Sequence, residues 1–155
     1  MICRMISPDE LREKAARYCA WRERCTMEVR DKLYQMGAGA ELTNRILEDL
    51  IRGRYIDDQR FADLYVQGKF RNNRWGKVKI SAGLKQRQIP DAVISRALAT
   101  IDETQYKQVL QRLITDKRAS LSEQKKKTIP EKTAAYCIQK GFESALVWDI
   151  LNKQP

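Results

Sequence analysis

The sequence predicts an all-α protein of three tandem three-helix repeats that form an elongated molecule. Apolar residues recur at helical spacing in short segments along the chain, and no segment shows sustained strand-type alternation. The pattern of one unit also recurs twice at a nearly constant interval, as in tandem repeats. Small units of this kind gain stability by stacking, so we expect an elongated molecule that can curve at the junctions. The alternative is a single compact bundle that keeps only a trace of duplication.

The middle and third helices of each unit carry the repeat most clearly. Leu33, Leu84 and Cys137 occupy equivalent places in the middle helices, at separations of 51 and 53 residues. At the same intervals the third helices repeat Leu42, Val93 and Leu146, then Ile46, Ala97 and Ile150, then Leu47, Leu98 and Leu151. The first helices match more loosely, through Phe61, Leu64 and Tyr65 in the second unit and Tyr106, Val109, Leu110 and Leu113 in the third. We therefore place the units at residues 8–53, 54–101 and 102–155, after an N-terminal tail of residues 1–7.

Start and stop signals divide the first unit into three helices. Residues 7–10, Ser-Pro-Asp-Glu, form a capping box with proline in the first turn, which begins the first helix. Gly37 and Gly39 follow the second helix, and Gly53 ends the third.

The second unit begins in residues 55–62, Tyr-Ile-Asp-Asp-Gln-Arg-Phe-Ala, where one helical unit is joined to the next. Asp57 or Asp58 can cap the new helix, and Ile56 and Phe61 are apolar anchors on either side. Adjacent side chains on a helix point in different directions, which argues against a metal site at the two aspartates. We expect Asp57, Asp58 and Phe61 to serve structure and Arg60 to face a partner.

The composition excludes several classes of function. The chain has four cysteines at irregular spacings and no histidine, which rules out Cys2His2 zinc sites and histidine-dependent catalytic arrangements. Nucleotide-binding and nucleophile motifs are also missing, so we expect no cofactor and no enzymatic activity. Cys19 and Cys137 fit a core, whereas Cys25, with Arg22 and Arg24 nearby, has a reactive thiol as its less favoured alternative. No apolar run is long enough for a membrane span, and we expect a cytoplasmic monomer.

Positive charge is concentrated in the second unit. The net charge of +10 divides into +1 for residues 1–7, zero for the first unit, +6 for the second and +3 for the third. Residues 69–87 contain seven cations and no carboxylate, together with an aromatic ring at Trp75. The cations are Lys69, Arg71, Arg74, Lys77, Lys79, Lys85 and Arg87. Such a segment is typical of a polyanion-binding site, although a solvated face, with Trp75 wedged between helices, is the simpler alternative. Arg87 lies at the end of an apolar stripe and is expected to extend its charge to solvent.

A second basic cluster precedes the last two helices. It contains Lys117 and Arg118 and then Lys125, Lys126 and Lys127. The cluster lies in a polar stretch that reads as a loop or a frayed helix end, and residues 128–131 then begin a helix. Its lysines either add a phosphate-binding arm or are simply solvated.

The chain resembles the bacterial RecX regulatory proteins. Residues 55–62, followed by Gly76, Ile80 and Leu84, are similar to the central signature of that family. The first unit is similar through Tyr18, Arg22, Glu23 and Arg24, then Val29, Leu33 and Gly37. Gln88 stands where family members usually have glycine.

The resemblance implies a non-enzymatic regulator of the RecA recombinase. Family members bind the RecA filament on single-stranded DNA and limit its ATP hydrolysis, coprotease activity and strand exchange. The alternative is a general helical nucleic-acid-binding module without RecA specificity, and a scaffold for another acidic protein is the third hypothesis. The expected contacts with RecA or DNA are Arg60, Lys69, Arg71, Arg74, Trp75, Lys77, Lys79, Lys85, Lys125, Lys126 and Lys127.

Overall fold

The computed structural model describes residues 5–121 and 126–154. Cys3 and Lys125 therefore lie outside the described residues. Over the described ranges all regular structure is helical, and no strand is present. The helices are α1 (Pro8–Trp21), α2 (Thr26–Gln35), α3 (Ala40–Arg52), α4 (Asp58–Asn73), α5 (Lys77–Gln86), α6 (Asp91–Leu98), α7 (Glu103–Ser120), α8 (Ile129–Gln139) and α9 (Ser144–Lys153). The predicted all-α class is confirmed.

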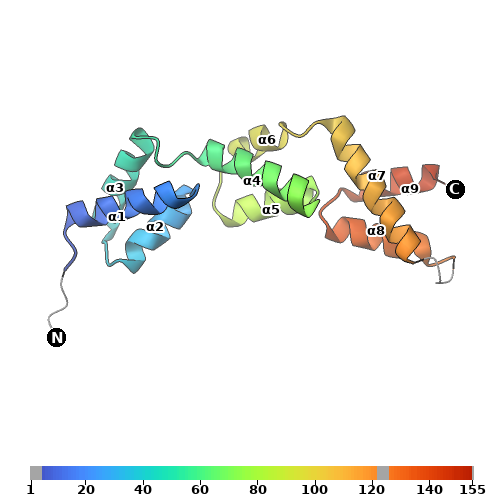
Figure 1. Ribbon diagram of the computed structural model, residues 1–155, viewed down its shortest axis with the longest axis horizontal. Helices are drawn as coiled ribbons and strands as arrows, with labels where there is room; N and C mark the ends of the chain where they lie inside the picture. The colour runs from blue at the N-terminus through green and yellow to red at the C-terminus, as the bar shows by residue number, and fades with distance from the viewer. Residues whose placement is uncertain (1–4, 122–125, 155) are drawn as a thin grey trace.

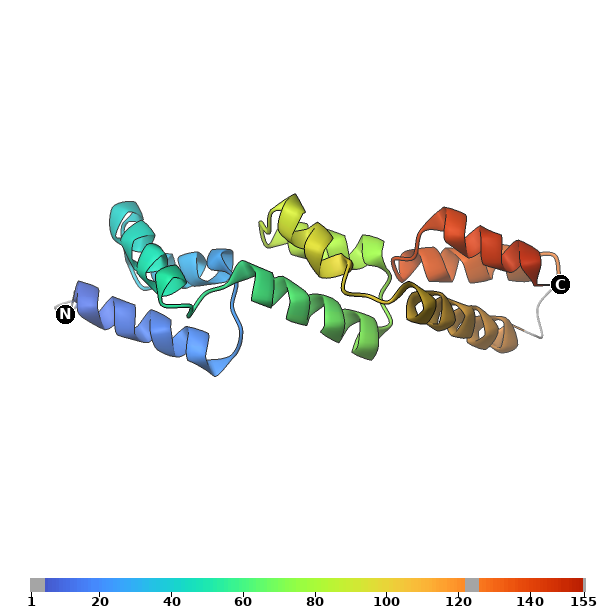
Figure 2. The ribbon, with the colours of Figure 1, turned by 90° about the horizontal axis from the view of Figure 1, so that it is seen from above.

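The helices form three groups of three that follow one another along the long axis of the molecule (Figure 1). The group α1–α3 lies at the N-terminal end, α4–α6 in the middle and α7–α9 at the C-terminal end, so the two termini are far apart. In the turned view of Figure 2, the first helices of the groups, α1, α4 and α7, follow one edge of the molecule. The elongated tandem arrangement is confirmed, and the single compact bundle is wrong. The residue boundaries of the three units stay a prediction.

The periodic apolar residues form the cores of these groups. Leu33, Leu84 and Cys137, which recur at equivalent places, are each 0% exposed. Leu64 is an exception, because its side chain is 57% exposed and lies outside the core. The buried positions of α4 are Phe61, Ala62, Val66 and Phe70, and Leu64 is on the other side of the helix. Leu64 thus matches the repeat pattern without belonging to the core, where the small Ala62 lies instead.

The described residues form two separate apolar cores rather than three. One core belongs to α1–α3 and includes Ile56 from the connection to α4. The other runs continuously through α4–α9, and Cys25, at the start of α2, also packs into it. The second and third repeats therefore share their interior, whereas the first repeat has its own core and reaches theirs through Cys25 and Met27.

Three equivalent turns place a residue in the left-handed region of backbone conformation. Gly37, Gln88 and Gly141 follow the middle helices of the three repeats with φ angles of 90°, 57° and 100°. Glycine adopts this conformation without steric cost, whereas a side chain at the same angle is strained. Of these three turns, only the one at Gln88 has the left-handed conformation without glycine.

The junction between the first and second repeats uses the two adjacent aspartates differently. Asp57 is the N-cap of α4 and accepts a hydrogen bond from the Arg60 backbone N–H at 3.0 Å. Asp58 points back to the first repeat, where the Thr26 N–H and hydroxyl donate to its two carboxylate oxygens at 2.8 and 2.9 Å. One aspartate therefore begins α4, and the other ties α4 to the start of α2.

Backbone contact joins the second and third repeats. The Gly76 N–H donates to the Lys140 carbonyl at 2.8 Å, and the Val78 N–H donates to the Gly141 carbonyl at 2.9 Å. A Cβ atom at Gly76 would lie only 2.3 Å from the Gly141 backbone. Two glycines thus allow the start of α5 to touch the turn after α8.

Candidate nucleic-acid interface

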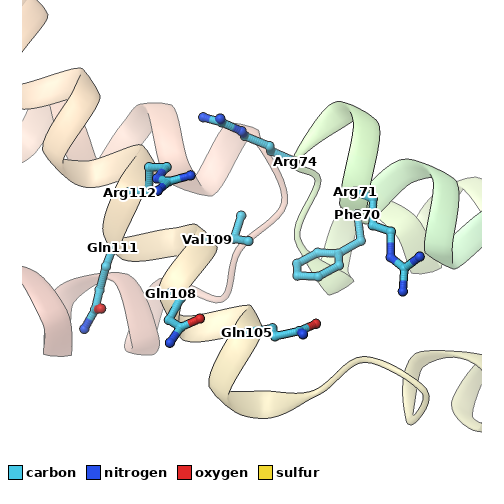
Figure 3. A pocket seen from close by; sticks show the side chains of 8 residues that line it. All are labelled: Phe70, Arg71, Arg74, Gln105, Gln108, Val109, Gln111 and Arg112. Carbon is cyan, nitrogen blue, oxygen red and sulfur yellow. The ribbon is translucent and has the colours of Figure 1, made fainter.

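A groove lined by arginine and glutamine lies between the end of α4 and the outer face of α7. Its volume is about 540 Å³. Figure 3 shows Phe70, Arg71 and Arg74 on the α4 side and Arg112 with three glutamines on the α7 side. The full lining is Phe70, Arg71, Arg74, Gln105, Gln108, Val109, Gln111 and Arg112. We call this feature the α4/α7 groove.

The α4 side of the groove is set by how α4 ends. Arg74 adopts a left-handed conformation, with φ of 54°, immediately after the last helical residue Asn73. This change of direction stops α4, and α5 begins three residues later at Lys77. Arg71 lies in the last turn of α4, where a positive side chain is favoured by the helix dipole. The two arginines are therefore placed together by one helix end.

The α7 side was not identified from the sequence. Gln105, Gln108 and Arg112 follow one another at spacings of three and four residues, so they share one face of α7. All three are exposed, whereas Tyr106, Leu110 and Leu113 on the opposite face are buried. This spacing would have been enough to predict the polar face of α7 from the sequence. The sequence does not show that this face lies opposite the end of α4, and the groove depends on that contact.

The charge in the groove is largely available to a ligand. Arg74 forms an exposed ion pair with Asp116 at 3.6 Å, which water screens strongly. Arg71 and Arg112 form no ion pair with a residue of the described ranges. Guanidinium groups bind phosphate and carboxylate through paired N–H donors, and glutamine amides add neutral donors and acceptors. The groove is suited to an extended polyanion.

Two RecX domain models match this chain. The model described as the RecX first three-helix domain matches residues 12–50, and that of the second three-helix domain matches residues 57–98. Together they cover just over half of the chain. The chain belongs to the RecX family.

Curated RecX relatives and solved RecX structures agree with this assignment. The protein named regulatory protein RecX in Clostridium tetani (strain Massachusetts / E88) is 30% identical over 128 residues, which are 81% of this chain and 58% of the relative. The chain thus spans less than two thirds of that relative's length. Regulatory protein RecX of Amycolatopsis mediterranei (strain U-32) is 23% identical, with 96% and 87% of the two chains covered. The crystal structure of RecX from Lactobacillus salivarius has the same fold, with a TM-score of 0.87 at 20% identity and coverage of 94% and 95%.

In this RecX chain, other predicted cations lie beside Trp75 rather than in the groove. The ammonium groups of Lys69 and Lys79 are 4.8 and 4.3 Å from the Trp75 ring centroid. The ring is half-buried and packs against the core of α4–α9. Trp75 therefore packs as the simpler alternative expected, and cation–π attraction holds the two lysines at its ring. Whether this segment binds a polyanion stays a prediction.

Lys77 is engaged inside the RecX fold. Its ammonium group pairs with Glu103, and its backbone N–H donates to the Tyr106 hydroxyl at 3.0 Å. The same hydroxyl donates to Glu143 at 2.8 Å. Burial, with the neighbouring carboxylates, raises the pKa of Tyr106 far above its usual value. Lys77 thus lies in the junction between the second and third repeats.

The remaining predicted contacts are spread over the molecule. Lys85 is exposed in the last turn of α5, and Arg87 is half-buried with its guanidinium 3.8 Å from Glu28. Arg60 pairs with Glu23 at 2.8 Å across the first junction, so its role toward a partner stays a prediction. Lys126 and Lys127 are exposed just before α8, which begins after Thr128 as expected.

The signature and cysteine residues of this RecX chain lie inside it. Phe61, Ile80 and Leu84 are buried in the core of α4–α9. Cys19, Cys25 and Cys137 are buried free thiols, and burial raises the pKa of each, for Cys19 and Cys137 to about 11. A reactive thiol at Cys25 is therefore wrong. Neither a metal-binding cluster nor a helix fit to cross a membrane occurs within residues 5–121 and 126–154.

Proposed function

We propose that this chain is a non-enzymatic regulator that binds the RecA filament on single-stranded DNA and inhibits ATP hydrolysis, coprotease activity and strand exchange. Membership of the RecX family carries the proposal, and the relatives named regulatory proteins support it. In this proposal the chain acts in the cytoplasm as a monomer and needs no cofactor.

The elongated form and the charge of the molecule support this function. A molecule of three repeats along one axis can follow a helical filament over more than one protomer. The net charge of +10 attracts both DNA and acidic protein surfaces. We assign the main contact to the α4/α7 groove, through Arg71, Arg74 and Arg112, with Lys69, Trp75, Lys79 and Lys85 extending it along the second repeat. Lys126 and Lys127, exposed just before α8, add an accessory phosphate contact in this proposal.

The test adds the purified chain to RecA assembled on single-stranded DNA and follows ATP hydrolysis and filament persistence. We expect both to fall at stoichiometric amounts of the chain. A variant with Arg71, Arg74 and Arg112 changed to glutamine should need at least about tenfold more protein, because the loss of even one hydrogen bond to a charged group costs about 1.5 to 3 kcal/mol.

Arg45 and Arg52 are exposed on α3 and lie outside the groove, so the control changes these two arginines to glutamine. This variant should inhibit like the wild-type chain. Unchanged ATP hydrolysis and filament persistence at stoichiometric wild-type protein would refute the proposed function.

The second candidate function is nucleic-acid binding without RecA specificity, which the cation-rich groove favours. Binding to naked single-stranded DNA should then depend steeply on salt, and the three-arginine variant should have a shallower slope. If affinity for naked DNA accounts for all of the effect on RecA, this second function holds instead. Equal inhibition of an unrelated DNA-dependent ATPase would reveal that case.

A further inference from the structure

The most exposed aromatic side chain of the first repeat lies at the end of α1. Trp21 is 87% exposed, whereas Trp75 and Trp148 are half-buried against the core of α4–α9. Tryptophan is usually well buried, and an indole exposed to water lacks the stabilisation that burial of its large apolar surface provides. The position of Trp21 is therefore unexplained by the packing of its own repeat.

Cations from two helices line the depression that contains this indole. Lys14, Arg17 and Tyr18 precede Trp21 at helical spacing on one face of α1, and Lys32 approaches from α2. These side chains, with Arg24, line a shallow depression of about 500 Å³ that we call the Trp21 surface. No aspartate or glutamate of the described residues lines it. Beside it, Arg17 makes an exposed contact with Glu13 at 3.9 Å, which contributes little in water.

The two aromatic rings of the Trp21 surface differ in accessibility. The guanidinium of Arg24 stacks on the Tyr18 ring, 3.8 Å from its centroid, and its Nε donates to the Tyr18 carbonyl at 3.3 Å. Lys32 lies 5.5 Å from the same centroid. Tyr18 thus holds the cations in place. No cation of the described residues lies on the ring of Trp21, which is therefore open to a ligand.

Charge balance in the first repeat concealed this surface. Residues 8–53 have a net charge of zero, yet the cations gather on one face of α1 and α2. Carboxylates of the repeat are used elsewhere, for example Glu28 at the start of α2 and Asp49 with Arg12. A zero net charge therefore hides a locally positive surface.

We propose that the Trp21 surface is a second nucleic-acid contact, where an unpaired base stacks on the indole and flanking phosphates meet Lys14, Arg17 and Lys32. Proteins that bind single strands combine stacking rings with a positive surface that follows the backbone. An acidic protein would use the cations but has no need of an open planar ring. This contact is separate from the α4/α7 groove, and its test needs no RecA.

The first measurement uses Trp21 as its own reporter. With Trp75 and Trp148 changed to phenylalanine, fluorescence comes from Trp21 alone. Adding single-stranded oligothymidylate of about 12 nucleotides, within the usual site sizes, should quench this emission. Circular dichroism establishes that the reporter variant keeps its helices. Quenching by polyglutamate as strong as by oligothymidylate would assign the surface to acidic protein and overturn the proposal.

The second measurement follows anisotropy of a labelled oligothymidylate with otherwise wild-type protein. Trp21→Ala should weaken binding about tenfold, and Trp21→Phe should keep most of the affinity because its ring still stacks. Tyr34→Ala is the matched control, since Tyr34 is a partly exposed aromatic of α2 outside this surface. Unchanged affinity in Trp21→Ala, or an equal loss in Tyr34→Ala, would refute the stacking contact whether or not RecA is regulated.

Discussion

At the scale of single residues, the equivalent turns allow the same backbone conformation to be compared with and without glycine. Gln88 has a φ of 57°, whereas its counterparts Gly37 and Gly141 have 90° and 100°. The repeat intervals of 51 and 53 residues place these three positions in register. Gln88 is also the position at which the family resemblance leads us to expect glycine, a residue that adopts this left-handed conformation without strain.

We therefore expect Gln88→Gly to raise the free energy of unfolding by about 1 kcal/mol, the approximate cost of a left-handed conformation for a residue with a side chain. Denaturant unfolding measures the change. The reverse substitution, Gly37→Ala, should destabilise by a similar amount, since a Cβ there has open space and meets only backbone strain. A lower stability of Gln88→Gly would contradict this account.

The buried cysteines should make stability depend on alkaline pH. Burial raises the pKa of Cys19 and Cys137 from 9.0 to about 11. The folded protein thus keeps these protons while the unfolded chain loses them. Their stabilising contribution is complete below pH 9 and is lost as pH rises toward 11, by about 1 kcal/mol per thiol at pH 10.

The check compares wild-type protein with a Cys19→Ala, Cys137→Ala variant by denaturant unfolding at pH 7 and pH 10. The stability advantage of the wild type should shrink at pH 10. An advantage that stays constant or grows with pH would contradict the raised pKa values.

At the scale of helices, the sequence predicts where helices begin, but it does not predict which helices contact one another. Helix beginnings at Pro8, Asp58 and Ile129 follow from caps and prolines within a few residues. Leu64 matches the repeat pattern but lies outside the core, because the loose periodicity of a first helix does not decide which apolar side chains are buried. The α4/α7 groove was half predicted, since Arg71 and Arg74 are local to one segment while Arg112 belongs to another.

The contact of α5 with the turn after α8 should depend on glycine at position 76. Gly76→Ala would place a Cβ 2.3 Å from the Gly141 backbone, so the two repeats must separate locally. We expect a loss of at least about 2 kcal/mol, because two inter-repeat backbone hydrogen bonds are disturbed as well.

Gly68→Ala is the matched control, since a Cβ at Gly68 in α4 meets nothing within 4 Å. This helical substitution should stabilise by about 0.5 to 1 kcal/mol. Thermal and denaturant unfolding of both variants measures the contrast. Equal effects of the two substitutions would mean that the close contact does not hold the repeats together.

At the scale of the whole molecule, the division into two cores predicts two cooperative units. Helices α4–α9 share one interior, whereas α1–α3 have their own. The first junction depends on polar contacts, chiefly Asp58 with Thr26 and Arg60 with Glu23. The repeat intervals predicted three equal units. They could not show that the second and third units share one core, because a shared core depends on contacts between side chains of different repeats.

Asp58→Ala should therefore loosen the first repeat selectively. It removes both hydrogen bonds from Thr26, which is a loss of about 1 to 3 kcal/mol at the junction. Hydrogen exchange should become faster in α2 and at the start of α4 and stay unchanged in α7–α9. Uniformly faster exchange along the chain would indicate a single cooperative unit instead.

The close approach of Gly76 and Gly141 has a mechanical consequence. The two backbone hydrogen bonds that accompany it hold the second and third repeats together without depending on a side-chain rotamer. At the first junction, by contrast, the Asp58 carboxylate provides the hydrogen bonds to Thr26. We therefore expect bending mainly at the first junction, which would move the first repeat, and the Trp21 surface with it, relative to the other two.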